Sequence, residues 1–214
     1  GRDAPPAHPR VDRALRRVLR QKIALGLFEH PYVEADAATA AFDTADDRTL
    51  ARRAAAEAVV VLTNNGVLPL GEAPGTIAVI GPAADDVRLT QGDYHYPAHV
   101  EIVFGPMGAD GLPEGGGAFS PGPYYPDTVT PLAALIEWYG ADHVVHERGC
   151  GLLGDDTTGF PAAVSATRSA DVAIVMDGGQ SGLVPPATVG EARDAADLAL
   201  TGVQSRLIAD VTAT

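Results

Sequence analysis

The chain has 214 residues, enough for one large domain or for a domain with an extension. Its formal net charge of -13 argues against a nucleic-acid ligand, because phosphate recognition requires clustered Lys and Arg side chains. No apolar run approaches the length that spans a membrane, and the single cysteine, Cys150, excludes an internal disulfide.

The N-terminal part of the chain is predicted to be helical. Apolar residues recur at three- and four-residue spacing from Val11 to Glu29, on a helix whose polar face is strongly basic. A basic helical face is most often a solvated surface, and we interpret this one in that way. A second helix is predicted from about Arg48 to Thr63, with apolar residues along one side.

The rest of the chain alternates short apolar runs with amphipathic segments. Strands are predicted at 76–80, 143–146 and 171–176, and helices at 130–140, 160–169 and from Thr201 onward. This order predicts an α/β fold: an open, mostly parallel sheet with helices on both faces, preceded by a helical linker. Residues 83–127 show little periodicity and many Gly and Pro residues, which indicates a long loop of functional character.

The stretch 177–200 is the candidate functional segment. It follows the last predicted strand and contains two adjacent prolines and a glutamate, Glu191, next to a glycine. In open α/β sheets, ligands bind at loops that leave the carboxyl ends of the strands. We therefore interpret this segment as a site loop, in which Glu191 is the candidate reactive residue.

A series of segments resembles glycoside hydrolase family 3 in order and spacing, from about Val11 to Thr214. The segments are VDRALRRVLRQKIALGLFEHPYV, ARRAAAEAVVVLTNNGVLPL, IAVIGPAAD, QGDYHYPAH, TPLAALIEWYG, ERGC, SADVAIVMDGG and GEARDAADLALTGVQ. Members of that family join a (β/α)8 barrel to an α/β sandwich domain and act as retaining exo-β-glycosidases. The resemblance therefore implies hydrolysis of terminal non-reducing β-D-glucosides or related β-glycosides.

The resemblance also implies a domain organisation. Residues 1–46 are expected to form a tail and an inter-domain linker helix, and residues 47–214 a partial sandwich domain with a long loop at about 83–127. No segment resembles the barrel, so the expected partner is an N-terminal (β/α)8 barrel domain that carries the nucleophile. No cofactor is expected, and this chain alone is expected to be inactive.

Glu191 matches the acid/base position of the family, in the pattern Gly-Glu-x-x-Asp. Retaining hydrolysis uses two carboxyl groups roughly 5–5.5 Å apart, one of which attacks the sugar while the other donates a proton to the leaving oxygen. The alternative is an ordinary solvated loop glutamate, ionised near the start of a helical turn.

Three residues are candidate substrate contacts. By the resemblance, Asp93 and Tyr94 border the subsite of the leaving-group sugar, where an aromatic ring can stack on a pyranose face. Simple packing is an equal alternative for Tyr94. Asp177 closes the last strand, where ligands are contacted, but a plain turn aspartate is equally compatible with that position.

No metal site is expected. His95 and His99 have a spacing that could bind zinc on a helix, with Glu101 nearby, but Pro97 between them makes a helix improbable. The chain also departs from the family pattern, with Ala195 where an arginine is usual and Thr201 where a proline is usual. These departures motivate an alternative function, that of a non-catalytic α/β binding or assembly module.

Overall fold

The structure is a computed structural model that describes residues 8–92, 94–95, 127–182, 187–191 and 194–214. The chain forms two compact units, Gly1–Leu62 and Thr63–Thr214. The predicted organisation into residues 1–46 and 47–214 stays a prediction. Among the described residues, no helix combines the length and apolar character needed to cross a membrane.

The first unit is helical. It contains α1 (Pro9–Ala24), two short 3₁₀ turns, η1 (Ala35–Ala37) and η2 (Thr39–Ala41), and then α2 (Ala45–Ala58). Helix α1 ends earlier than the predicted Glu29, because the chain turns through Gly26 at a φ of 68°.

Helix α2 differs from its prediction at both ends. It begins before Arg48, because Thr44 and Asp47 form a reciprocal capping box in which each side chain accepts from the other's backbone N–H. It stops at Ala58 instead of near Thr63, because the run of valines that follows is β-branched and favours the extended backbone observed at Val59.

The second unit is built on a parallel sheet of three strands in the order β2-β1-β3. The strands are β1 (Ile77–Ile80), β2 (Val144–Glu147) and β3 (Val172–Val175). Ile77 pairs with Val144 on one side and with Val172 on the other. All four residues of β1 are fully buried, as expected for a central parallel strand.

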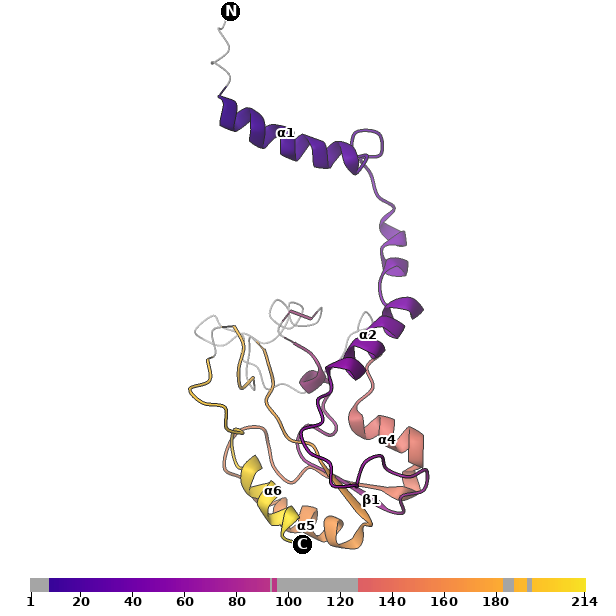
Figure 1. Ribbon diagram of the computed structural model, residues 1–214, viewed down its shortest axis with the longest axis vertical. Helices are drawn as coiled ribbons and strands as arrows, with labels where there is room; N and C mark the ends of the chain where they lie inside the picture. Colours follow the sequence, from indigo (N-terminus) through magenta and orange to yellow (C-terminus); the bar gives the residue numbers. More distant parts are fainter. Residues whose placement is uncertain (1–7, 93, 96–126, 183–186, 192–193) are drawn as a thin grey trace, which may run out of the picture. The chain divides into compact units, whose positions relative to one another are not determined.

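Helices cover both faces of this sheet (Figure 1). They are α4 (Pro131–Tyr139), α5 (Phe160–Ser169) and α6 (Gln204–Thr212). Because side chains alternate along a strand, Ala78 and Ile80 pack with α5 and α6, whereas Ile77 and Val79 pack with α4. The predicted fold class is confirmed, and α5 has the predicted bounds.

The loop after β1 contains a short 3₁₀ helix, η3 (Val87–Thr90). Residues 93 and 96–126 of the predicted long loop lie outside the described part of the chain, as do residues 183–186 and 192–193 of the predicted site loop.

Candidate functional site

The site loops begin side by side at the carboxyl edge of the sheet. Gly81 follows β1 at a φ of +115°, and a Cβ added there would lie 2.2 Å from the carbonyl oxygen of Met176. Only glycine permits this close approach. Backbone bonds join the strand ends: Gly81 N donates to Glu147 O at 3.1 Å and Ala83 N to Met176 O at 3.0 Å.

The loop after β3 folds back on itself before it reaches Glu191. Thr188 N donates to Gln180 O at 2.8 Å, and Gln180 N donates to Thr188 Oγ1 at 3.0 Å. Gly182 N donates to Val189 O at 3.0 Å, one step further along. These hydrogen bonds join the start of the loop to the residues just before Glu191. The residues that lead into Glu191 are therefore held in place.

A buried glutamine fixes the root of that loop. Gln204, the first residue of α6, is fully buried, and its Oε1 accepts from Gly178 N at 2.9 Å. Its Nε2 donates to Gly178 O at 2.9 Å and lies 3.3 Å from Leu152 O. Thr201, where the family resemblance leads one to expect proline, donates its hydroxyl to Leu152 O at 2.7 Å. The loops after β2 and β3 are thereby joined to the last helix.

The loop after β1 contains a buried arginine. Asp86 caps η3 by accepting from Arg88 N at 2.8 Å, and the Arg88 side chain is only 7% exposed. Its Nη1 contacts Nε2 of His95 and lies 3.5 Å from Oε1 of Gln91. Nδ1 of His95 contacts the carbonyl oxygen of Gly92.

Two residues singled out from the sequence meet at this edge. The hydroxyl of Tyr94, in the loop after β1, donates to Oε2 of Glu191, in the loop after β3, across 97 positions of sequence. Both side chains are exposed, Tyr94 to 70%. The fold thus brings together the predicted acid/base and one predicted substrate contact; their roles stay predictions.

Asp177 lies at the carboxyl end of β3, as predicted, but both of its carboxyl oxygens are shielded from solvent. Within the described residues neither oxygen has a hydrogen-bond partner. Burial raises the pKa of Asp177 to about 6. Burial, followed by the charge of Asp177, also raises the pKa of the Cys150 thiol, which lies in the loop after β2. The substrate contact proposed for Asp177 stays a prediction.

The positions considered for a metal site, and Asp93, form no described site. Asp93, His99 and Glu101 lie outside the described residues. His95 is described, and its contacts are with Arg88 and Gly92. Within the described part of the chain, no group of three or more His, Cys, Asp or Glu side chains could hold a metal ion.

Sequence reasoning missed two residues of this region. Gln204 occupies the buried stripe of α6, three residues before Leu207 and seven before Val211, so a polar residue at an apolar position was the available signal. Arg88 is a lone basic residue in an acidic, irregular loop, which gives a weaker signal.

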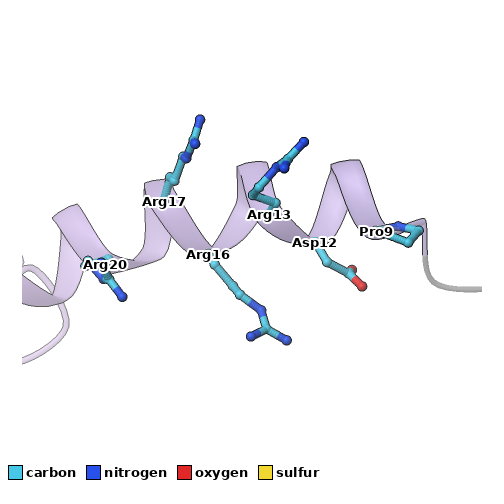
Figure 2. Close-up of a pocket in the computed structure, with 6 residues that line it drawn as sticks. All are labelled: Pro9, Asp12, Arg13, Arg16, Arg17 and Arg20. Atoms are coloured by element: carbon cyan, nitrogen blue, oxygen red, sulfur yellow. The ribbon is translucent and has the colours of Figure 1, made fainter.

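A hollow on the first unit does not form a comparable site. It runs along α1 and is lined by Pro9, Asp12, Arg13, Arg16, Arg17 and Arg20 (Figure 2). The side chains of Arg13 and Arg17 point to one side of the helix and that of Arg16 to the other, so the cations do not converge on a ligand. This arrangement fits a solvated basic face.

Comparison with known proteins gives consistent matches. The sequence model of the glycosyl hydrolase family 3 C-terminal domain matches residues 59–214. A beta-xylosidase of Formosa agariphila is 33% identical over 202 residues, which are 92% of this chain and 24% of that protein. The chain spans a quarter or less of the length of the curated relatives considered, 24% of one and 18% of another.

Two solved structures are also similar. A family 3 exo-beta-xylosidase in complex with a xylobiose aziridine activity-based probe matches 78% of this chain and 17% of its own, with 26% identity and a TM-score of 0.56. A beta-glucosidase involved in saponin metabolism from intestinal bacteria matches 95% of this chain and 28% of its own, with 24% identity and a TM-score of 0.70, and shows the fold. Because the family model covers most of the sequence, the chain belongs to glycosyl hydrolase family 3, as a representative of its C-terminal domain.

Proposed function

We propose that this chain supplies the acid/base half of the active site of a retaining exo-β-glycosidase, with Glu191 as the general acid and base. The observation that carries the proposal is the meeting of Tyr94 and Glu191 at the carboxyl edge of a parallel sheet, in a domain of this family. Loops at that edge are the usual location of ligand sites in open α/β folds.

The chemistry divides between two carboxyl groups. A nucleophilic carboxylate attacks the anomeric carbon while protonated Glu191 gives its proton to the leaving glycosidic oxygen. Ionised Glu191 then takes a proton from water, which attacks the glycosyl–enzyme bond and releases the sugar with retained configuration. The nucleophile belongs to a barrel domain outside this chain.

The exposure of Glu191 agrees with a shared site. A carboxyl group that serves a substrate held between two domains must be open to its own domain's surface, and the Glu191 side chain is exposed. Asp93, Tyr94 and Asp177 are proposed to contribute to the binding of the leaving-group sugar. Tyr94 is the best placed of the described residues, because its ring lies exposed beside the reacting carboxyl group.

Among β-glycosides, β-xylosides are the first substrates to examine. The relatives that match most of this chain are named beta-xylosidases, and one matching structure is of a beta-glucosidase. The choice of β-xylosides rests on these names. The residues proposed here bind the leaving-group sugar, and they do not contact the sugar that becomes attached to the nucleophile.

The test is made in the longer polypeptide that carries this chain. Glu191→Ala should lower kcat/KM for an alkyl or weakly activated aryl β-xyloside by about 100- to 10,000-fold, the range for loss of a general acid. With 2,4-dinitrophenyl β-xyloside, whose leaving group needs no proton, the first chemical step should survive. Added azide should then yield a β-xylosyl azide.

Glu137→Ala on α4 is the matched control, because it removes an exposed carboxylate outside the site. It should leave all of these rates unchanged. Equal losses for both leaving groups in Glu191→Ala, with no azide product, would contradict the acid/base role.

The non-catalytic alternative is favoured by the departures from the family pattern at Ala195 and Thr201. A binding or assembly module would show no change in any rate on substitution of Glu191. The 214-residue chain by itself should not hydrolyse aryl β-xylosides or β-glucosides, because it lacks the nucleophile; turnover that disappears in Glu191→Gln would contradict this division of the site.

A further inference from the structure

A buried arginine and a histidine lie next to the Tyr94–Glu191 contact, and neither has a role in the chemistry above. We propose that Arg88 and His95 are positioning residues that hold Tyr94 on Glu191, so that the Tyr94 hydroxyl orients the carboxyl group for proton transfer. This inference rests on the proposed function of Glu191 and assigns the residues that control it.

The position of the Tyr94 ring depends on the residues around it. Its side chain is 70% exposed, and the residue lies in a turn instead of a helix or strand. So exposed a ring buries too little apolar surface to offset the entropy lost when its rotamer is fixed. The contact of its hydroxyl with Glu191 therefore depends on neighbouring residues that hold the backbone in place.

His95, the next residue, is held at both ring nitrogens. Nη1 of Arg88 contacts Nε2 and lies 3.4 Å from Nδ1, and the carbonyl oxygen of Gly92 contacts Nδ1. A guanidinium group can only donate hydrogen bonds, so the tautomer that satisfies the two closest contacts accepts from Arg88 at Nε2 and donates to Gly92 from Nδ1. Both contacts fix the imidazole ring directly beside Tyr94.

Arg88 connects this clamp with the other loop. Its Nη2 lies 3.9 Å from the position that a Cβ on Gly182 would occupy, so the guanidinium group borders the loop after β3 at Gly182. Gly182 N donates to Val189 O, two positions before Glu191. One buried side chain therefore lies against the loop that carries Glu191 and holds the residue that follows Tyr94.

The consequence is a defined orientation for both partners of the contact. A hydroxyl that donates to a carboxylate oxygen stabilises the ionised carboxylate, and a hydrogen bond to a charged group is stronger than one between neutral groups. The positioning role suits an arginine better than a lysine. A lysine ammonium lacks the planar, forked set of donors that can contact His95 while another nitrogen lies against Gly182.

Hydrogen exchange of the 214-residue chain tests the clamp without any need for turnover. Arg88→Met and His95→Phe should raise deuterium uptake severalfold in the peptides that contain Tyr94 and Glu191, with β1 unchanged. His95→Gln, which keeps an acceptor and a donor, should have a smaller effect. Arg168→Met, which removes an exposed arginine from α5, is the control and should change neither peptide. Unchanged uptake in Arg88→Met, or uptake that rises equally in β1, would overturn the proposal.

The leaving-group dependence of the longer polypeptide tests the effect on Glu191. Tyr94→Phe should lower kcat/KM for an alkyl β-xyloside severalfold and leave the first step with 2,4-dinitrophenyl β-xyloside nearly unchanged, because a misoriented Glu191 donates its proton less well. Arg88→Met should give a similar selective loss that disappears in the Tyr94→Phe background. A loss that is additive in the double variant, or a loss of thermal stability with no change in leaving-group dependence, would overturn the proposal.

The two proposals fail in different ways. If Glu191→Ala leaves the rates unchanged, the acid/base assignment fails, and the positioning proposal, which depends on it, fails with it. If Glu191→Ala behaves as expected but Arg88→Met changes neither deuterium uptake nor leaving-group dependence, only the positioning proposal is wrong.

Discussion

The two compact units of this chain differ in what stabilises their helices. In Gly1–Leu62, neither α1 nor α2 has a single buried residue, and the apolar stripe of α1 is open, with Leu15 exposed to 52%. In Thr63–Thr214, β1 is completely buried between helices on both faces. An amphipathic pattern thus predicts a helix and identifies its apolar face. It does not predict whether another part of the same chain packs against that face.

The largest effect should come from a matched pair of leucine substitutions. Leu207→Ala, at a fully buried position of α6, should lower the free energy of unfolding by about 3–4 kcal/mol, through lost burial and a residual cavity. Leu15→Ala on α1 should change it by about 0.5 kcal/mol or less. Urea unfolding of the 214-residue chain, followed by circular dichroism, measures both. Equal losses would contradict the contrast between the units and indicate that α1 packs on a core.

Gln204→Leu should cost about 2 kcal/mol, because it leaves the N–H and carbonyl groups of half-buried Gly178 without their partner. Gln21→Leu, on exposed α1, is the control and should be close to neutral. The same urea titration measures the difference. A neutral Gln204→Leu would mean that water replaces the side chain, and that the root of the site loop is more open than described.

Asp177→Asn should stabilise the protein in a pH-dependent manner. Burial raises the pKa of Asp177 from 3.8 to about 6, so the folded protein binds this proton more tightly than the unfolded chain does. The stability that protonation provides is complete below about pH 4 and is lost as the pH rises through 6. At pH 7 the variant should therefore be more stable than the parent by about 1–2 kcal/mol, a value discounted for partial solvent screening.

At pH 4 the same substitution should be nearly neutral, and this internal comparison separates titration from packing. The measurement is urea unfolding at both pH values. An equal gain at pH 4 and pH 7 would contradict the assignment of the effect to the Asp177 proton.

The smallest effects concern the helix caps. Thr130, 7% exposed, caps α4 by accepting from Ala133 N at 3.1 Å and donates its hydroxyl to Asp85 at 2.8 Å. Thr130→Ala should cost about 1–2 kcal/mol, and Thr130→Ser much less. Thr44→Ala, in the exposed cap of α2, should cost about 0.5–1 kcal/mol and act on helix content in the first unit alone. Thermal unfolding monitored at 222 nm distinguishes the two; a larger effect at Thr44 would reverse the contrast.

Local signals explain how far the sequence predicted the fold. The Thr130-Pro131 start and the Gly140 stop gave α4 its bounds, and the apolar runs located the three strands to within a residue or two. The end of α2 was missed because a valine run satisfied the helical pattern while its β-branched side chains favoured extension.

The site was harder to predict, because its contacts depend on the tertiary fold. Glu191 was singled out as the glutamate of the predicted site loop, and its acid/base role and Tyr94 were predicted through the resemblance to a family. Their contact spans 97 positions and is made by two loops that only the sheet order brings together. Arg88 and His95 are only seven positions apart in one loop, but that loop is irregular, and no periodic pattern predicts a side-chain contact there. No short-range pattern encodes a contact between the loops of non-consecutive strands.

The sheet order has a consequence for the synthesis of this protein. β1 emerges from the ribosome before β2 and β3, yet it becomes the central strand, with Ile77 pairing with Val144 and Val172. Until β2 has been translated both edges of this apolar strand are unpaired, and until β3 has been translated one edge remains unpaired, which favours aggregation of the nascent chain. We therefore expect that β1 is a preferred target for chaperones during translation, and that ribosome-bound chains ending before β3 engage them most strongly.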